Sequence, residues 1–212
     1  MTGKNNRFGN SMRSVLAVAL CAVAALGMYL HADAKGGAAT HGMTRAERIR
    51  AKLESSDRDY VFVVMHRGDW RHAPENSVGA IKGAINHGAD IVEIDVAKTK
   101  DGRYVLLHDD VIDRVTNGKG ACADYTLEEL KKFRLRSSDG KTLTNYRILS
   151  LEEAFNITRG KILVNLDKFP RDPKGIAECV RRCGMEREVV LKGGFSPNAL
   201  KERMGEQWGG IA

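Results

Sequence analysis

Short apolar runs alternate with amphipathic segments along the chain from residue 59 onward. The apolar runs predict buried strands at 59–66, 90–97, 161–167 and 188–192. Apolar residues three and four positions apart, together with start and stop residues, predict helices at 43–53, 76–87, 150–160 and 174–183, and a last one opening at Ser196-Pro197. This alternation of strand and helix indicates an α/β fold with a parallel sheet.

One predicted strand breaks the regular order. Residues 104–108 follow the strand at 90–97 after a short polar connection. A parallel crossover needs a dozen residues or more, so we expect this strand to pair antiparallel with its predecessor. Residues 98–150 then form an insertion. Thr126-Leu127-Glu128-Glu129 is a capping box inside it, and Ser150-Leu151-Glu152-Glu153 is a second one that opens the next helix.

The strand at 90–97 carries two carboxylates where a buried parallel strand should be apolar throughout. Glu93 and Asp95 are two residues apart, so both side chains point to one face, while the apolar residues around them point to the other. Adjacent carboxylates in an interior repel each other and lose hydration. We therefore expect a compensating divalent cation, and oxygen ligands favour Mg²⁺ or Ca²⁺. The alternative is a salt-bridged pair at a sheet edge.

Polar residues also end the neighbouring strands. The four strand ends concerned are His66, His108, Asp167 and Lys192. In parallel α/β folds, sites form at the carboxyl ends of the strands, so these residues predict an active site at that edge. His72 and His87, in contrast, are expected to be exposed, with His72 in the loop where it could touch substrate.

Several motifs stand in a fixed order along the central part of the chain. They are His66-Arg67-Gly68, Pro74-Glu75-Asn76-Ser77, Gly88-Ala89-Asp90-Ile91-Val92-Glu93-Ile94-Asp95-Val96, Thr99-Lys100-Asp101-Gly102, Val105-Leu106-Leu107-His108-Asp109, Asp113-Arg114-Val115-Thr116-Asn117-Gly118-Lys119-Gly120 and Leu149-Ser150-Leu151-Glu152-Glu153. Together they resemble the glycerophosphodiester phosphodiesterases from about residue 60 to 192. Their order and spacing make the resemblance much more specific than one short motif.

The resemblance implies a TIM-barrel type (β/α)₈ fold with a small subdomain inserted after the second strand, where residues 98–150 fall. It also implies metal-dependent hydrolysis of glycerophosphodiesters to an alcohol and glycerol 3-phosphate. His66 and His108 would act as general base and acid and exchange roles between steps, which suits the near-neutral titration of histidine.

The resemblance further assigns the binding groups. Glu93, Asp95 and Asp167 would hold the metal. Arg67 would bind the phosphate through its planar guanidinium. Apart from the resemblance, Lys192 at the end of the last predicted strand could contact the phosphate in place of the family's lysine near Asp167. Glu75 and Asn76 would belong to the loop beside the site.

The strand ending at Asp167 departs from the family pattern, which has Glu, an apolar residue and Lys. Asp167 is one methylene shorter than Glu, and Lys168 is adjacent, so it should point to the opposite face. The substrate could therefore differ from simple glycerophosphodiesters.

Only about the first half of the barrel is expected in this chain. The sequence predicts four parallel strands, whereas a full barrel takes eight and about 250 residues. A half barrel exposes an apolar edge, so the chain would be a fragment, a partner in a homo-oligomer that completes the barrel, or a truncated remnant. The alternatives to the enzyme are a non-catalytic protein that binds glycerophospho groups, an inactive remnant, or a cyclising enzyme like lysophospholipase D.

The N-terminus predicts export. Residues 1–34 contain basic residues, an apolar run and Ala32-Asp33-Ala34, the order of a secretory signal peptide. The expected location is periplasmic or secreted, with an uncleaved membrane anchor as the alternative. Residues 35–58 are a polar approach to a domain at 59–212. The net positive charge, which remains without residues 1–34, suits a small anionic substrate or a membrane surface. Nothing in the pattern suggests a nucleic acid.

Overall fold

The computed structural model describes residues 42–55, 59–191 and 198–199. The predicted signal peptide at 1–34 and the predicted phosphate ligand Lys192 lie outside these residues, as does most of the helix expected after Ser196. The chain divides into a unit at 1–43 and a unit at 44–212, and the described helices and strands belong to the second. Among the described residues, no helix has the length and apolar character needed to cross a membrane.

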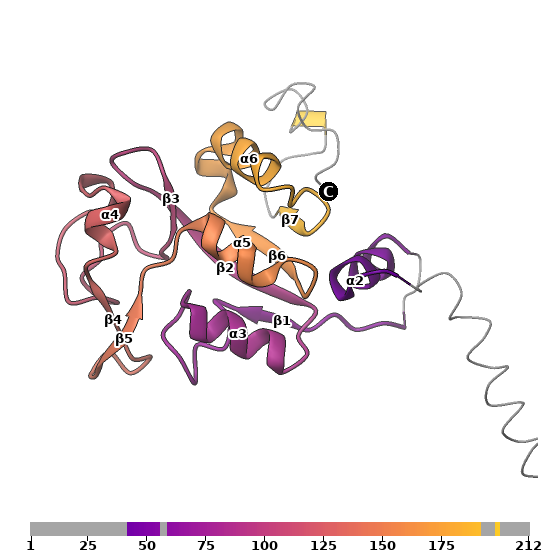
Figure 1. The fold of residues 1–212 in the computed structure, drawn as a ribbon, viewed down its shortest axis with the longest axis horizontal. Helices are drawn as coiled ribbons and strands as arrows, with labels where there is room; N and C mark the ends of the chain where they lie inside the picture. Colours follow the sequence, from indigo (N-terminus) through magenta and orange to yellow (C-terminus); the bar gives the residue numbers. More distant parts are fainter. Residues whose placement is uncertain (1–41, 56–58, 192–197, 200–212) are drawn as a thin grey trace, which may run out of the picture. The chain divides into compact units, whose positions relative to one another are not determined.

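A parallel sheet forms the centre of the fold (Figure 1). Its strands are β1 (Val64–His66), β2 (Ile91–Lys98), β6 (Leu163–Asp167) and β7 (Val189–Leu191), hydrogen-bonded in this order. β3 (Tyr104–Leu106) pairs with β2 antiparallel, which confirms the prediction drawn from the short connection. The described part of the chain thus holds the four parallel strands that the sequence predicts.

Helices connect the parallel strands close to their predicted positions. They are α3 (Val78–Asn86), α5 (Leu151–Thr158) and α6 (Pro173–Arg182), with α2 (Arg45–Glu54) before β1 and the short helix η2 (Phe169–Arg171) after β6. At the start of α5 the Ser150 hydroxyl accepts a hydrogen bond from the N–H of Glu153, whose carboxylate accepts one from the N–H of Ser150. The predicted capping box is therefore confirmed.

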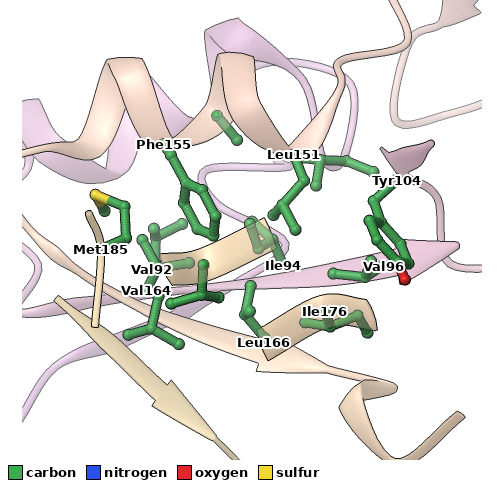
Figure 2. Packing of buried hydrophobic residues seen from close by; sticks show 14 of the residues in the cluster. Val92, Ile94, Val96, Tyr104, Leu151, Phe155, Val164, Leu166, Ile176 and Met185 are labelled. Carbon is green, nitrogen blue, oxygen red and sulfur yellow. The ribbon is translucent and has the colours of Figure 1, made fainter. Parts of the chain in front are cut away.

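The core lies on one face of β2. Val92, Ile94 and Val96 pack there with residues of β6 beneath α5, whose Leu151 and Phe155 are fully buried (Figure 2). Burial of one such side chain stabilises the fold by about 1.5–3 kcal/mol. Because a slip of one residue would exchange the two faces of the strand, this packing also fixes where the carboxylates of β2 project.

The first strand is shorter and more exposed than predicted. Strand geometry is limited to Val64–His66, so the prediction of a buried strand over 59–66 is wrong for residues 59–63. Val61, Val63 and Val64 are 81%, 53% and 49% exposed. A continuous apolar run indicates a strand covered on both faces, but β1 pairs only with β2 among the described residues.

The insertion has its own small hydrophobic cluster. Its elements are η1 (Cys122–Asp124), α4 (Leu127–Leu130) and a hairpin of β4 (Arg134–Arg136) and β5 (Leu143–Arg147) (Figure 1). Buried residues such as Leu107, Ile112 and Leu130 form the cluster. The sequence did not predict the hairpin, because its short strands lack a clear alternation of apolar and polar residues. The capping box at Thr126 is present as predicted.

Candidate active site

Three carboxylates meet on the face of the sheet opposite the core. Glu93 and Asp95 project from β2, and Asp167 ends β6, where it lies in register with Asp95. Each residue offers a carboxylate oxygen, and these three oxygens lie within 4.8 Å of one another. The parallel register thus brings together the three residues predicted as metal ligands.

The environment of this cluster favours a bound cation. Glu93 is 6% exposed and Asp95 is fully buried. Burial raises the pKa of Glu93 above its ordinary value and repulsion by Asp95 and Asp167 adds to the rise, although the N–H of Arg67 hydrogen-bonds to Glu93 at 2.8 Å. Asp95 Oδ1 is buried and has no hydrogen-bond partner among the described residues. A donor set made of carboxylate oxygens fits Mg²⁺ or Ca²⁺.

Asn76 holds the other oxygen of Asp95. Its amide nitrogen donates to Asp95 Oδ2 at 2.9 Å, and its Oδ1 accepts from the N–H of Asp95 at 3.1 Å. Asn76 is 3% exposed and has a φ of 57°, a left-handed conformation that asparagine adopts more readily than most residues. Asn76 therefore fixes the position of Asp95, and Asp95 Oδ1 remains without a hydrogen-bond partner among the described residues.

The turn after β1 brings Arg67 to the cluster. Arg67 Nε lies 3.5 Å from Asp95 Oδ2, and Nη1 lies 3.1 Å from Glu75 Oε1. The chain turns through positive φ at both Arg67 and Gly68. A Cβ on Gly68 would lie 2.6 Å from the carbonyl carbon of Ala80 in α3, so glycine is needed for this close approach. The sequence His66-Arg67-Gly68 thus ends the strand and directs a guanidinium over the carboxylates.

The imidazole of His66 is exposed and that of His108 is partly buried, with side-chain exposures of 63% and 37%. His66 lies in register with Glu93, and its Nε2 is 3.9 Å from Glu93 Oε2. His108 follows β3, and its Nδ1 lies 2.6 Å from Asp109 Oδ1. Because an ionised carboxylate only accepts hydrogen bonds, Asp109 keeps the proton of His108 on Nδ1. His108 Nε2 is then the nitrogen that can exchange a proton with a substrate.

Arg114, in the insertion, bridges two carboxylates. One is Glu75, in the loop before α3, and the other is Asp109, which bonds to His108. Its Nη1 and Nη2 donate to Glu75 at 2.9 and 2.8 Å, and its Nε donates to Asp109 at 2.6 Å. Hydrogen bonding by Arg114 is the main cause that lowers the pKa of Asp109 far below its ordinary value. Burial raises the pKa of Glu75, but Arg114 and Arg67 outweigh it and the net shift is downward. Both carboxylates are therefore ionised near neutral pH.

Sequence reasoning missed two residues of this site. Asn165 lies on β6 in register with Glu93, and its Oδ1 is buried with no hydrogen-bond partner among the described residues. The same two-residue spacing that links Glu93 to Asp95 links Asn165 to Asp167, so the sequence did contain a signal. Arg114 stood within one of the motifs that carry the resemblance, but its contacts with Glu75 and Asp109 became visible only in the folded chain.

Lys168, expected to point away from Asp167, follows the last residue of β6. It lines a cavity of about 450 Å³ together with core-side residues such as Val96, Tyr104 and Ile176. Its backbone is left-handed, with a φ of 61°. The neighbouring Phe169 is buried in the core. Among the described residues, no ion pair joins Lys168 to Glu93, Asp95 or Asp167, so the positive charge beside these carboxylates comes from Arg67.

The model of the glycerophosphoryl diester phosphodiesterase family matches residues 66–197. A glycerophosphodiester phosphodiesterase of Caldanaerobacter subterraneus is 37% identical over 148 residues, which cover 66% of this chain and 60% of that protein. The chain thus spans about three fifths of the length of this curated relative.

Solved structures share the fold. A glycerophosphoryl diester phosphodiesterase from Parabacteroides distasonis has a TM-score of 0.68 at 31% identity, over 80% of this chain and 59% of that chain. A phosphodiesterase from Oleispira antarctica, solved with the product sn-glycerol-3-phosphate, has a TM-score of 0.56 at 25% identity, over 69% of this chain and 63% of that chain. These similarities confirm the predicted barrel-type fold, of which this chain matches a little over half.

Proposed function

Because this chain belongs to the glycerophosphoryl diester phosphodiesterase family, we propose that it hydrolyses glycerophosphodiesters to an alcohol and glycerol 3-phosphate. The main support is the position of the carboxylates Glu93, Asp95 and Asp167 on one face of the sheet, with His66 and Arg67 directly beside them. A buried carboxylate cluster next to an arginine and an exposed histidine is suited to binding a phosphodiester rather than to packing.

Arg67 binds the substrate phosphate in this proposal. Its side chain is 18% exposed and contacts both Glu75 and Asp95, which hold the guanidinium in place beside the carboxylates. A planar guanidinium can donate two parallel hydrogen bonds to a phosphate. Lys192, which lies outside the described residues, is a second phosphate contact in the same proposal.

His66 and His108 transfer the protons. One imidazole takes the proton of the glycerol hydroxyl next to the phosphate, whose oxygen attacks phosphorus, and the other protonates the departing alcohol oxygen. The roles then reverse: water is deprotonated, attacks the cyclic phosphate and opens it, and the released glycerol oxygen receives a proton. General acid–base catalysis of this type contributes about 10²–10⁴-fold.

A divalent cation, Mg²⁺ or Ca²⁺, is part of the proposal. Glu93, Asp95 and Asp167 would hold it. Two oxygens support this assignment: Asp95 Oδ1 and Asn165 Oδ1. Both are buried and have no hydrogen-bond partner among the described residues. A bound cation there supplies positive charge that offsets the charge developing on the phosphoryl oxygens.

The test is an assay of the full chain for glycerol 3-phosphate release from glycerophosphocholine, with Mg²⁺ or Ca²⁺ and with chelator. His66→Ala is the inactivating variant, and Lys82→Ala, at an exposed position of α3, is the matched control. We expect release that needs the cation, is lost in His66→Ala and is kept in Lys82→Ala. A folded protein that binds glycerophosphocholine without cleaving it would favour the binding-protein alternative instead.

The reaction products distinguish the hydrolase from the remaining alternative, a cyclising enzyme. A hydrolase releases glycerol 3-phosphate, whereas a cyclising enzyme stops at the cyclic phosphate. Phosphorus NMR of the reaction mixture distinguishes the two compounds directly. Accumulation of the cyclic phosphate as the end product would assign the chain to the cyclising class.

Export is proposed as well, on the strength of residues 1–34 alone. The basic residues, the apolar run and Ala32-Asp33-Ala34 support secretion with cleavage after Ala34. The N-terminal sequence of the protein recovered from its native host is the test, and a mature chain that still begins at Met1 would contradict it.

A further inference from the structure

Asp69, His72 and His87 form a second cluster of possible ligands, apart from the carboxylates of the proposed active site. His72 Nδ1 lies 2.8 Å from Asp69 Oδ1, and His87 Nε2 lies 3.2 Å from Asp69 Oδ2. One ligand atom from each residue lies within 4.8 Å of the other two. Two imidazoles from different segments therefore converge on one carboxylate.

Asp69 is buried, whereas the two histidines are exposed. The side chain of Asp69 is 8% exposed, whereas those of His72 and His87 are 74% and 60% exposed. The sequence predicted that both histidines would be exposed, which is correct, but it gave no sign that they would meet. An arrangement with one buried anchor and two accessible imidazoles is open to an ion from solvent.

The fold makes room for the carboxylate of Asp69. A Cβ on Gly83, in α3, would lie 2.6 Å from Asp69 Cβ and 2.8 Å from Asp69 Oδ2. The N–H of Asp69 donates to the carbonyl of Ala80, also in α3, at 2.9 Å. Asp69 is therefore seated against the helix whose C-terminal cap is His87, and any side chain at position 83 would displace it.

We propose that Asp69, His72 and His87 bind a divalent transition-metal ion, with Zn²⁺ as the best fit. In a tetrahedral zinc site with ligands at about 2.0–2.1 Å, ligand atoms lie roughly 3.3 Å apart, close to the separations from Asp69 to each histidine. Imidazole nitrogen favours zinc, copper or nickel over Mg²⁺ and Ca²⁺. The chain would thus carry two chemically distinct metal sites, one with oxygen ligands and one with nitrogen ligands.

The expected role of this ion is structural. Asp69 and His72 belong to the segment between β1 and α3, which also carries Arg67, Glu75 and Asn76. A metal ion bridging this segment to His87 at the end of α3 ties the loop to the helix. The loop residues that contact the carboxylate cluster are then held in place at both ends.

The test measures zinc binding to the full chain, purified without a histidine tag. The protein is titrated with Zn²⁺ against a chromogenic indicator in excess Mg²⁺, which saturates the oxygen site. His72→Ala and His87→Ala are the test variants, and His108→Ala is the matched control, since it removes an exposed imidazole outside the cluster. Circular dichroism establishes that each variant is folded.

We expect one tightly bound zinc per chain that Mg²⁺ does not displace. Loss of a supporting partner outside the ligand set weakens metal sites about 10–100-fold, so loss of either histidine ligand should weaken binding by about 100-fold or more. The melting temperature should rise with Zn²⁺ in the wild type and in His108→Ala but not in the test variants. Equal zinc affinity in all variants, or no bound zinc in the wild type, would reduce the cluster to an ordinary ion pair between an aspartate and histidines.

Discussion

Two groups of carboxylates a short distance apart in the fold behave in opposite ways. In the carboxylate cluster, burial and like charges raise the pKa of Glu93. The second group is the bridged pair, Glu75 and Asp109, both bonded by Arg114. Hydrogen bonds lower the pKa of Asp109, and at Glu75 the arginines outweigh the rise in pKa that burial causes. The difference lies in the source of positive charge. Arg114 hydrogen-bonds to both carboxylates of the bridged pair. In the cluster, Arg67 lies 3.5 Å from Asp95 Oδ2, and the proposed divalent cation would supply further positive charge to the three carboxylates.

This contrast matches the two tasks of the proposed site. The bridged pair aligns His108 through Asp109 before any substrate arrives, because its hydrogen bonds are complete within the protein. The cluster groups three carboxylates around one neighbouring arginine, so the proposed ion would add to its stabilisation. A preassembled acid–base group beside a site proposed to bind an ion and the phosphate is a combination suited to phosphodiester hydrolysis.

The most severe test of the contrast is Glu93→Gln. Removing one buried charge should lower activity by about 10³-fold, the equivalent of several kcal/mol of metal-derived stabilisation. In chelator, however, the same change should raise the melting temperature by about 2–4 °C, which is what 1 kcal/mol produces in a chain of this size. Lower stability of the metal-free variant than of the metal-free wild type would mean that the cluster is not short of positive charge. Activity and thermal unfolding with and without chelator are the measurements.

The next largest effect is expected for His108→Ala. Removing the imidazole should lower kcat by about 10²–10³-fold and leave KM nearly unchanged, because a general acid or base acts mainly on the chemical step. Steady-state kinetics on glycerophosphocholine measure both values. A change confined to KM would instead assign His108 to substrate binding.

Arg114→Gln tests whether the bridged pair positions the catalytic histidine. We expect kcat to fall by about tenfold, with a shift in the pH profile of kcat, since Asp109 loses its main hydrogen-bond donor. Arg114→Lys should recover only part of the loss, because lysine cannot make the two-pronged contacts. A variant with reduced stability but an unchanged pH profile would show that Arg114 has only a structural role.

We also expect the stability lost in Arg114→Gln to depend on pH. Asp109 and Glu75 have pKa values below their ordinary ones, so their contribution is present above about pH 4–4.5, where these groups are ionised in the unfolded chain, and is lost as pH falls through the lower folded values. Urea unfolding should therefore show that Arg114→Gln is less stable by about 1 kcal/mol at pH 7. The gap should close in strong acid. A gap that stays constant down to about pH 2 would contradict this linkage.

The smallest effect is expected for Lys168→Ala. Lys168 lines the 450 Å³ cavity together with Val96 and Ile176, and none of the three carboxylates Glu93, Asp95 and Asp167 lines that cavity. Its removal should change kcat/KM by less than about twofold, a difference of under 0.5 kcal/mol. A loss of tenfold or more would show that Lys168 reaches the substrate from its side of the sheet.

The fold could be read from the sequence where one short-range rule dominates. Capping boxes at Thr126 and Ser150 and the antiparallel pairing of 104–108 depend on neighbouring residues and on chain length, and all three are confirmed. The burial of β1 could not be read in this way, because it depends on what lies beside the strand. The β4–β5 hairpin escaped prediction because its stability depends on the insertion as a whole.

The sequence by itself determined which chemical groups are available and on which face of each strand they lie, since side chains alternate with a period of two along a strand. That rule suffices for Glu93 with Asp95. Only the tertiary structure decided that Arg114 meets Asp109 and that His72 and His87 share Asp69. His87 meets Asp69, and Arg114 meets Glu75, across segments that are separate in the sequence. The shorter-range contacts from Arg114 to Asp109 and from His72 to Asp69 depend on loop conformations. In both cases the partners are set by how helices and loops pack on the sheet, which no local pattern of residues encodes.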